Sequence, residues 1–207
     1  MSARPAAHLA LAHSDREVPV ISLIGLPGGG KSSTGRQLAR RLNQPFEDTD
    51  IVVERQLGES IRSFFEREGE ARFRDVEEAV LRDLMLTFSG VLATGGGAVL
   101  RPANRAQLRE NSTVIYLTAT PESLMRRLRF DAKRPLLQTH DPLARLQELY
   151  AQRDPLYRET AHFQIATGRP PVSVLVTMIL TQLELAGVID PYLVPSIVDP
   201  TAPMPFQ

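Results

Sequence analysis

The chain has no cysteine, so it can form no disulfide, offers no thiolate to a metal and has no cysteine nucleophile. It also has no excess charge, because 24 Lys and Arg residues balance 24 Asp and Glu residues. No overall field therefore attracts nucleic acid or an anionic membrane, and any cationic site must be local. Long apolar runs are also missing, since residues 6–12 are interrupted by His8 and followed by charges, which fits no signal or membrane segment. These absences predict a cytoplasmic protein with no nucleic-acid or membrane partner.

The remaining composition is that of one globular domain. The chain has 207 residues, of which 43% are hydrophobic, and this is enough to bury one sizeable core. No internal repeat of fixed period and no coiled-coil heptads occur. We therefore expect one domain at residues 18–186, preceded by a tail at 1–17 and followed by a proline-rich tail at 187–207.

One short segment indicates the ligand of this domain. Residues 25–32 read Gly-Leu-Pro-Gly-Gly-Gly-Lys-Ser and fit the pattern G-x-x-x-x-G-K-[ST], directly after an apolar run at 18–24 that predicts a strand. In this pattern, glycines let backbone N–H groups face phosphates, Lys31 reaches the outer phosphates and the Ser32 hydroxyl is a magnesium ligand. A helix that starts after the loop also favours anions at its positive end. The expected phosphate-binding residues are Gly28, Gly29, Gly30, Lys31, Ser32 and Ser33. Strand, loop and helix in this order favour a nucleoside triphosphate with magnesium over a simple flexible turn.

Further along the chain, apolar runs with strand character alternate with helix-like segments. Strands are expected at residues 18–24, 91–93, 113–117 and 162–166, with a further short one ending near 46–50. Helices are expected at residues 31–42, 70–88, 102–110, 121–129, 142–150 and 172–186. This alternation predicts an α/β fold with a parallel, helix-covered sheet that binds ligands at the carboxyl ends of its strands.

A second informative segment is Phe-Glu-Asp-Thr-Asp at residues 46–50. On a strand, Asp48 and Asp50 would share a face, and two adjacent carboxylates need a cation or hydrogen-bond donors between them. The alternative is a turn in which Asp50 caps the next helix. The functional interpretation is favoured by the sequence after the strand at 91–94. Many phosphate-loop ATPases have a magnesium-binding Asp there, whereas this chain has glycines. Asp48 is then the candidate magnesium ligand.

Several other features have both a functional and a structural interpretation. The glycines at 95–97 can turn N–H groups toward an anion, although turns also use glycine. Arg74 and Glu77 are three residues apart on a helix and could form an ordinary exposed salt bridge. The basic run at 126–134 fits a solvated face, or a flexible flap that neutralises a transferred phosphoryl group. Arg153, near the end of a predicted helix, could bind an anion or satisfy the helix dipole.

Taken together, these motifs resemble the shikimate kinase family. The resemblance covers about residues 18–186 and rests on the phosphate loop, the acidic motif, the glycine triplet and the segments 73–77, 134–137 and 153–157. It implies a three-layer α/β/α P-loop NTPase fold with a central five-stranded parallel sheet and a flexible lid at about 130–142. It also implies transfer of the ATP γ-phosphoryl group to the 3-hydroxyl of shikimate, with Mg²⁺, by a monomer in aromatic amino acid biosynthesis.

The resemblance also assigns roles to individual residues. The implied catalytic residues are Lys31, Asp50 and Arg134. Those implied to bind shikimate are Asp50, Arg74, Gly96 and Arg153. Ser32 and Asp48 would hold magnesium, while Arg127 and Arg134 would contact ATP in addition to the loop. A late nucleotide contact falls near Arg169, where two following prolines leave the register open.

Three other functions are weaker alternatives. A regulatory module fused to a helix-turn-helix domain is not expected, since about 17 residues precede the first strand. A kinase for gluconate or another polyol acid would leave the motifs at 73–77 and 153–157 unexplained. A guanine-nucleotide switch would need an Asn-Lys-x-Asp sequence, and the chain has none.

Overall fold

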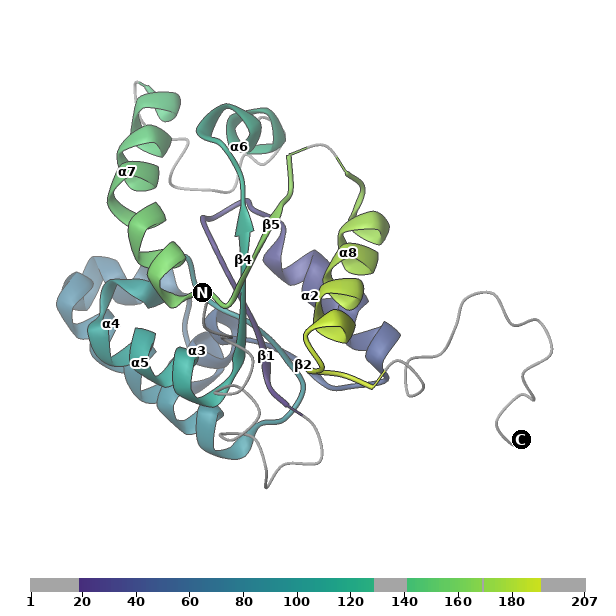
Figure 1. Ribbon diagram of the computed structural model, residues 1–207. Coiled ribbons are helices and arrows are strands. Elements are labelled where there is room, and N and C mark those ends of the chain that lie inside the picture. Colours follow the sequence, from purple (N-terminus) through teal and green to yellow (C-terminus); the bar gives the residue numbers. More distant parts are fainter. Residues whose placement is uncertain (1–18, 129–140, 169, 191–207) are drawn as a thin grey trace, which may run out of the picture.

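The computed structural model describes residues 19–128, 141–168 and 170–190. In this part of the chain, five parallel strands form one sheet in the order β2-β3-β1-β4-β5 (Figure 1). The strands are β1 (Ile21–Ile24), β2 (Phe46–Asp48), β3 (Val91–Ala93), β4 (Thr113–Thr118) and β5 (Phe163–Ala166). The predicted five-stranded parallel sheet is confirmed, with β1 between β3 and β4.

Helices cover both faces of this sheet. They are α2 (Lys31–Leu42), α3 (Thr49–Leu57), α4 (Ile61–Thr87), α5 (Pro102–Asn111), α6 (Pro121–Leu128), α7 (Pro142–Thr160) and α8 (Val172–Leu185), with a short 3₁₀ helix η1 (Ala98–Leu100). Helices α2 and α8 pack together on one face, while α4, α5 and α7 lie on the other (Figure 1). The three-layer α/β/α arrangement is therefore confirmed.

Alternating side chains on the strands divide the core between these two faces. On β4, Val114 and Tyr116 belong to the apolar cluster that includes α4, α5 and α7. Ile115 and Leu117 belong to the opposite cluster, with α2 and α8. All four side chains are buried, so the middle of β4 is apolar on both faces, as expected for a parallel sheet covered on both sides.

Two helices are longer than the sequence pattern predicted. Helix α4 covers the expected segment 70–88 except its last residue, but it begins at Ile61, and Gly69, with φ 79° and ψ 173°, separates its two helical halves. Helix α7 was expected to end at Tyr150, yet it runs to Thr160 with Pro155 inside it. A proline removes one helical hydrogen bond, but the buried face of α7 packs on the core and keeps the helix continuous.

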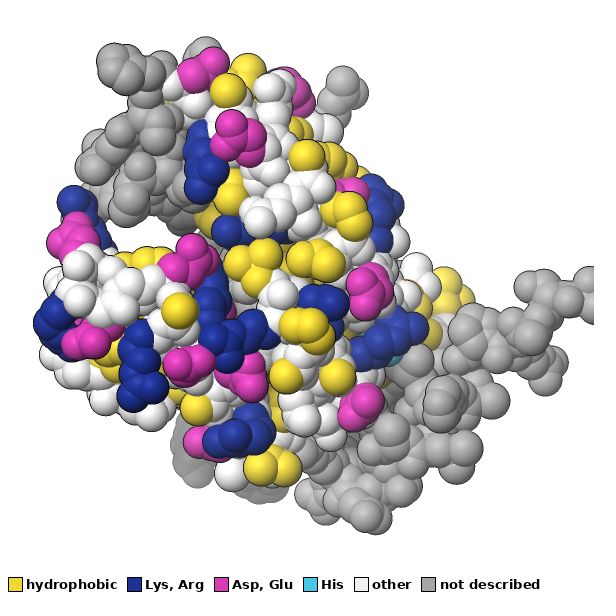
Figure 2. Space-filling model, turned by 90° about the vertical axis from the view of Figure 1, so that its left-hand side faces the viewer, with side chains coloured by type: hydrophobic (Ala, Val, Ile, Leu, Met, Phe, Trp, Pro, Cys, Tyr) yellow, Lys and Arg dark blue, Asp and Glu magenta, His cyan; other side chains and the backbone are white. Residues whose placement is uncertain are grey.

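Some predictions concern residues that the structure does not describe, and others concern membrane-spanning helices and surface charge. Arg134, Arg169, the tail at 1–17, most of the lid at 130–142 and most of the tail at 187–207 lie outside the described residues. Among the described helices, none is both long and apolar enough to cross a bilayer. On the side where α4, α5 and α7 lie, cationic and anionic side chains are interspersed, as the balanced charge predicts (Figure 2).

Candidate active site

The phosphate loop connects β1 to α2 and has the backbone shape that its glycines permit. Gly28 and Gly30 have φ values of 81° and 88°, in the left-handed region where a side chain would strain the backbone. Gly29 donates its N–H to the Leu26 carbonyl at 3.1 Å, which closes the turn. No side chain caps the N-terminus of α2, so this helix end presents free backbone donors to an anion, and Ser33 is exposed in its first turn.

Lys31 is held inside this loop although it carries a charge. Its side chain is buried, and Nζ donates to the carbonyl oxygens of Gly25 at 2.8 Å and Leu26 at 3.0 Å. These two bonds offset part of the cost of burying the ammonium group and fix its position in the loop. A phosphate bound there would meet a cation that is already positioned.

Asp48 connects the acidic motif to the phosphate loop. It is the last residue of β2, it is buried, and its Oδ2 accepts a hydrogen bond from the Ser32 hydroxyl at 2.6 Å. Its Oδ1 accepts from the backbone N–H of Asp50 at 3.1 Å, which caps α3. The prediction that Asp48 and Asp50 share a strand face is therefore wrong, because α3 begins at Thr49. The capping alternative was correct in kind, but the cap is Asp48 and not Asp50.

Asp48 and Ser32 together fit a magnesium ion. A carboxylate and a hydroxyl are the oxygen donors that Mg²⁺ prefers, and it commonly takes only one or two protein ligands, with phosphates and water completing its shell. Among the described residues, no group of three His, Cys, Asp or Glu side chains could hold a metal by itself. A bound triphosphate would supply the missing oxygens, so the pair fits magnesium that arrives with a nucleotide.

Asp50 stands beside this pair in the first turn of α3. Partial desolvation raises the pKa of its carboxyl to about 6, and the charge of Asp48 adds to this effect while Lys31 opposes it. The residue is nevertheless exposed, so water and a small ligand can still reach it. A carboxylate with a pKa in this range can accept a hydrogen bond or a proton near neutral pH.

The glycine triplet after β3 makes room for the groups around it. A Cβ atom at Gly95 would lie 2.5 Å from Asp50 Oδ1 and 2.8 Å from Glu77 Oε1, and one at Gly97 would collide with the guanidinium of Arg74. The Gly95 N–H donates to the Thr49 hydroxyl at 2.8 Å. The triplet therefore has a packing function that the sequence did not reveal, since it allows an acid and an arginine to approach the backbone.

Arg74 and Glu77 form a buried pair and not the exposed salt bridge considered from the sequence. Arg74 Nη1 lies 2.7 Å from Glu77 Oε2, with side-chain exposures of 12% and 3%. Burial raises the pKa of Glu77, and the positive charge of Arg74 opposes this shift. Arg74 Nη2 also contacts Glu70 at 2.9 Å, on the exposed side. The guanidinium is thus fixed beside the glycine triplet and Asp50.

Arg153 approaches the same triplet from α7. Its Nη1 donates to the Gly96 carbonyl at 3.0 Å, and the Tyr157 hydroxyl donates to the same oxygen at 2.6 Å. Arg153 Nε is buried and has no hydrogen-bond partner among the described residues. Because α7 continues to Thr160, Arg153 does not serve the C-terminal dipole of a helix, so that alternative is wrong.

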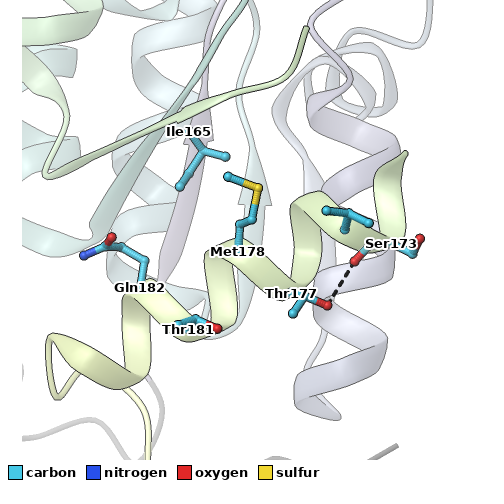
Figure 3. Close-up of a pocket in the computed structure, with 7 residues that line it drawn as sticks. Ile165, Ser173, Thr177, Met178, Thr181 and Gln182 are labelled. Carbon is cyan, nitrogen blue, oxygen red and sulfur yellow. Dashed lines mark hydrogen bonds between the residues drawn. The ribbon is translucent and has the colours of Figure 1, made fainter. Parts of the chain in front are cut away.

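These side chains all lie at the carboxyl ends of β1, β2 and β3, as expected for an open parallel sheet. A separate cavity of about 490 Å³ lies between β5 and α8 (Figure 3). Its lining includes Ile165, Ser173 and Met178 and contains no charged side chain, so it does not fit a triphosphate. The charged cluster at the strand ends is therefore the candidate active site.

Comparison with known proteins identifies the family. The family model for shikimate kinase matches residues 27–184, from within the phosphate loop to the last helix. A shikimate kinase of Paracidovorax citrulli is 58% identical over 176 residues, which cover 83% of this chain and 95% of that protein. The chain belongs to the shikimate kinase family. A shikimate kinase of Ralstonia nicotianae is 52% identical over 187 residues, covering 90% of this chain and 97% of that protein.

Solved structures agree with membership of the shikimate kinase family. The shikimate kinase from Acinetobacter baumannii, determined in complex with shikimate, gives a TM-score of 0.78 at 41% identity and covers 85% of this chain and 98% of that one. A gluconokinase from Sinorhizobium meliloti gives a TM-score of 0.54 at 19% identity, with 83% and 95% of the two chains covered, and therefore shares the fold alone.

The structure does not bring every residue expected from the shikimate kinase resemblance to one cluster. Arg127 donates to the Thr167 hydroxyl at 3.2 Å, between α6 and the loop after β5, and no contact joins it to the acidic motif. Sequence reasoning assigned no role to Thr49, Glu77 or Tyr157, which contact the site residues directly. Thr49, Glu77 and Tyr157 each lie within one of the motifs quoted from the sequence, and this was the only sequence signal that pointed to them.

Proposed function

We propose that the protein transfers the γ-phosphoryl group of ATP to the 3-hydroxyl of shikimate, giving shikimate 3-phosphate and ADP. The observation that carries this proposal is the placement of one accessible carboxylate, Asp50, between Lys31 in the phosphate loop and the two arginines beside the glycine triplet. This arrangement suits an acceptor with a hydroxyl at one end and a carboxylate at the other.

Substrate binding is assigned to the cationic end of the site. Arg74 and Arg153 approach the triplet from α4 and α7, and each guanidinium offers planar donors that match a carboxylate. Gly96 lies between them, and its backbone completes this subsite. Glu77 and Glu70 compensate part of the charge of Arg74, and a substrate carboxylate would complete the pairing of both guanidinium groups, which favours an anionic acceptor over a neutral sugar.

Phosphoryl transfer is assigned to the acidic and phosphate-loop end. The acceptor oxygen bonds to the γ-phosphorus as the bond to the β–γ bridging oxygen breaks, and the hydroxyl proton passes to Asp50. In a loose transition state, the larger effect of Asp50 is to orient the hydroxyl. Lys31 stabilises negative charge that develops on the transferred group.

The nucleotide and its metal complete the proposal. Ser32 and Asp48 would hold Mg²⁺, which neutralises charge on the β- and γ-phosphates when bound. Gly28, Gly29, Gly30 and Ser33 would contact the phosphates through the loop and the start of α2. Arg127 and Arg134 would complete the nucleotide contacts, and closure of the lid expected at about 130–142 would exclude water. A cytoplasmic monomer with no partner beyond ATP and shikimate is part of the same proposal.

The test is ADP release by the purified protein with ATP and magnesium, in parallel reactions that contain shikimate, gluconate or no acceptor. We expect shikimate-dependent ADP release and a product heavier by one phosphoryl group in mass spectrometry. Equal release with gluconate would assign a broader acceptor range. Shikimate binding without turnover would instead identify a sensor.

A further inference from the structure

The carbonyl oxygen of Gly96 accepts two hydrogen bonds from one helix. Tyr157 Oη lies 2.6 Å away and Arg153 Nη1 lies 3.0 Å away. The two residues are four positions apart on α7, so they project from the same side of the helix. Arg153 is also part of the proposed carboxylate subsite. Its guanidinium therefore has two possible acceptors, the Gly96 carbonyl and the substrate carboxylate.

The two donors differ in how firmly they are held. Tyr157 is fully buried, and its ring stacks on Tyr116 with centroids 4.9 Å apart. The Tyr116 hydroxyl is bonded to Asp154 at 2.9 Å, and Asp154 is paired with Arg158 at 2.6 Å. Arg153 has fewer fixed contacts, because its Nε has no partner among the described residues, while Nη1 bonds to the Gly96 carbonyl and the guanidinium also contacts the Tyr157 side chain. Tyr157 is therefore the permanent donor and Arg153 the one that can move.

We propose that Tyr157 is a positioning residue that keeps the Gly96 carbonyl bonded, so that Arg153 can leave it for the substrate carboxylate. This inference rests on the proposed function, since it concerns the same substrate subsite. A partly buried carbonyl without a donor is costly, whereas losing one of two donors is not. With Tyr157 in place, the movement of Arg153 leaves no unsatisfied group behind.

Removing the Tyr157 hydroxyl should favour the hydrogen bond of Arg153 to Gly96 over its bond to the substrate carboxylate. In Tyr157→Phe, the Gly96 carbonyl depends on Arg153 alone, so substrate must compete with the protein for this guanidinium. Burial raises the pKa of Tyr157 above its usual range, so the hydroxyl remains a donor at every working pH. The effect of the substitution should therefore be independent of pH between neutral and mildly alkaline conditions.

The first experiment compares steady-state kinetics of wild type, Tyr157→Phe and Tyr116→Phe. Tyr116→Phe is the matched control, because it removes the same atom from the stacked ring, but that hydroxyl contacts Asp154 and not Gly96. We expect Tyr157→Phe to raise the KM for shikimate about 3- to 10-fold, with kcat and the KM for ATP changed by less than about twofold. An unchanged KM for shikimate, or an equal rise in Tyr116→Phe, would overturn the proposal.

A second experiment separates this role from a simple structural one. We expect Tyr157→Phe to lower kcat/KM for shikimate in the wild-type background but not in an Arg153→Ala background, where no guanidinium has to be released. A tyrosine that only supported the glycine triplet would lower kcat/KM equally in both backgrounds, and that result would refute the inference. Wild type in the same assay tests the proposed function separately, and absence of shikimate-dependent turnover there would overturn both.

Discussion

The two ends of the candidate active site are built in different ways. The nucleotide end is made from contiguous chain, since the loop at residues 25–32 folds around its own glycines and holds Lys31 with its own carbonyls. The acceptor end is made from four separate segments, which bring Asp50, Arg74, Gly96 and Arg153 together. The first depends on backbone geometry and the second on buried pairs of side chains. Substitutions at the two ends should therefore affect different kinetic quantities, turnover at the nucleotide end and shikimate binding at the acceptor end.

The largest expected effect is at the nucleotide end. Lys31→Met should lower turnover by about 10³-fold or more, because the described part of the chain contains no other ammonium that could stabilise the transferred phosphoryl group. The measurement is ADP release at saturating ATP and shikimate. Arg40→Met, which removes an exposed cation from the same helix, is the control and should retain activity. Substantial activity in Lys31→Met would show that this loop is not the phosphate site.

Asp50 lies where the two ends meet, and its loss should affect the rate more than binding. Asp50→Asn should lower kcat by about 10²-fold, because an amide accepts the hydroxyl proton poorly and orients the nucleophile less well. Steady-state kinetics in both substrates provide the measurement, and Asp83→Asn on the exposed face of α4 is the control. An unchanged kcat would remove Asp50 from the mechanism.

A smaller and more selective effect is expected at the acceptor end. Arg74→Lys should weaken shikimate binding by about 10-fold while ATP binding stays within about twofold, since an ammonium cannot contact Glu77 and a carboxylate as a planar fork does. Titration calorimetry with each ligand measures both constants. Arg101→Lys is the matched control, because Arg101 pairs with Asp75 and Glu78 outside the site. Equal weakening of both ligands would assign Arg74 to the nucleotide end.

The same contrast explains what the sequence could predict. The phosphate loop and the helix at 31–42 follow from a local pattern, and the structure confirms that helix with the same bounds. The central sheet was predictable because buried parallel strands are continuous apolar runs. The strand expected in the acidic motif is present as Phe46–Asp48, and only Asp50 was misplaced, because Asp followed by Thr and Asp fits a strand end or a helix cap. The hydrogen bond from the Asp50 N–H to Asp48 Oδ1 decides for the helix cap.

Tertiary contacts account for most of what was missed. Glu77 looked like half of an exposed ion pair, and nothing in the helix pattern shows that Gly95 and Gly97 bury it with Arg74. The length of α7 was missed because Pro155 normally ends a helix, and the packing that keeps it continuous comes from distant strands. Such features depend on partners far away in sequence, which a pattern of neighbours does not contain.

Activity at the acceptor end should depend on the ionisation of Asp50. Its pKa is raised to about 6, so protonation removes the hydroxyl acceptor as pH falls through this value. Wild-type kcat/KM for shikimate at saturating ATP, which reports the enzyme–ATP complex before shikimate binds, should fall about tenfold between pH 7 and pH 5. The profile is measured with ATP saturating and with stability checked at each pH. A flat profile down to pH 5 would mean that the ionised form of Asp50 is not required.

The smallest expected effect concerns the free energy of unfolding. Asp50→Asn, which should lower kcat, should increase the stability of the protein. The pKa of Asp50 is raised from 3.8 to about 6 in the folded protein, so the folded state binds the proton more tightly than the unfolded state. Stability from this group is then highest below pH 3.8 and falls as pH rises through 6, where ionising the carboxyl disfavours the folded state. Asp50→Asn should therefore stabilise the protein at pH 8 by about 1 kcal/mol, a value reduced for the solvent exposure of this residue. The gain should shrink toward pH 4, as measured by urea unfolding of both proteins. If Asp50→Asn is less stable than wild type at pH 8, the favourable interactions of the Asp50 carboxylate with Lys31 and the N-terminus of α3 exceed its desolvation cost. The ionised carboxylate would then stabilise the folded protein.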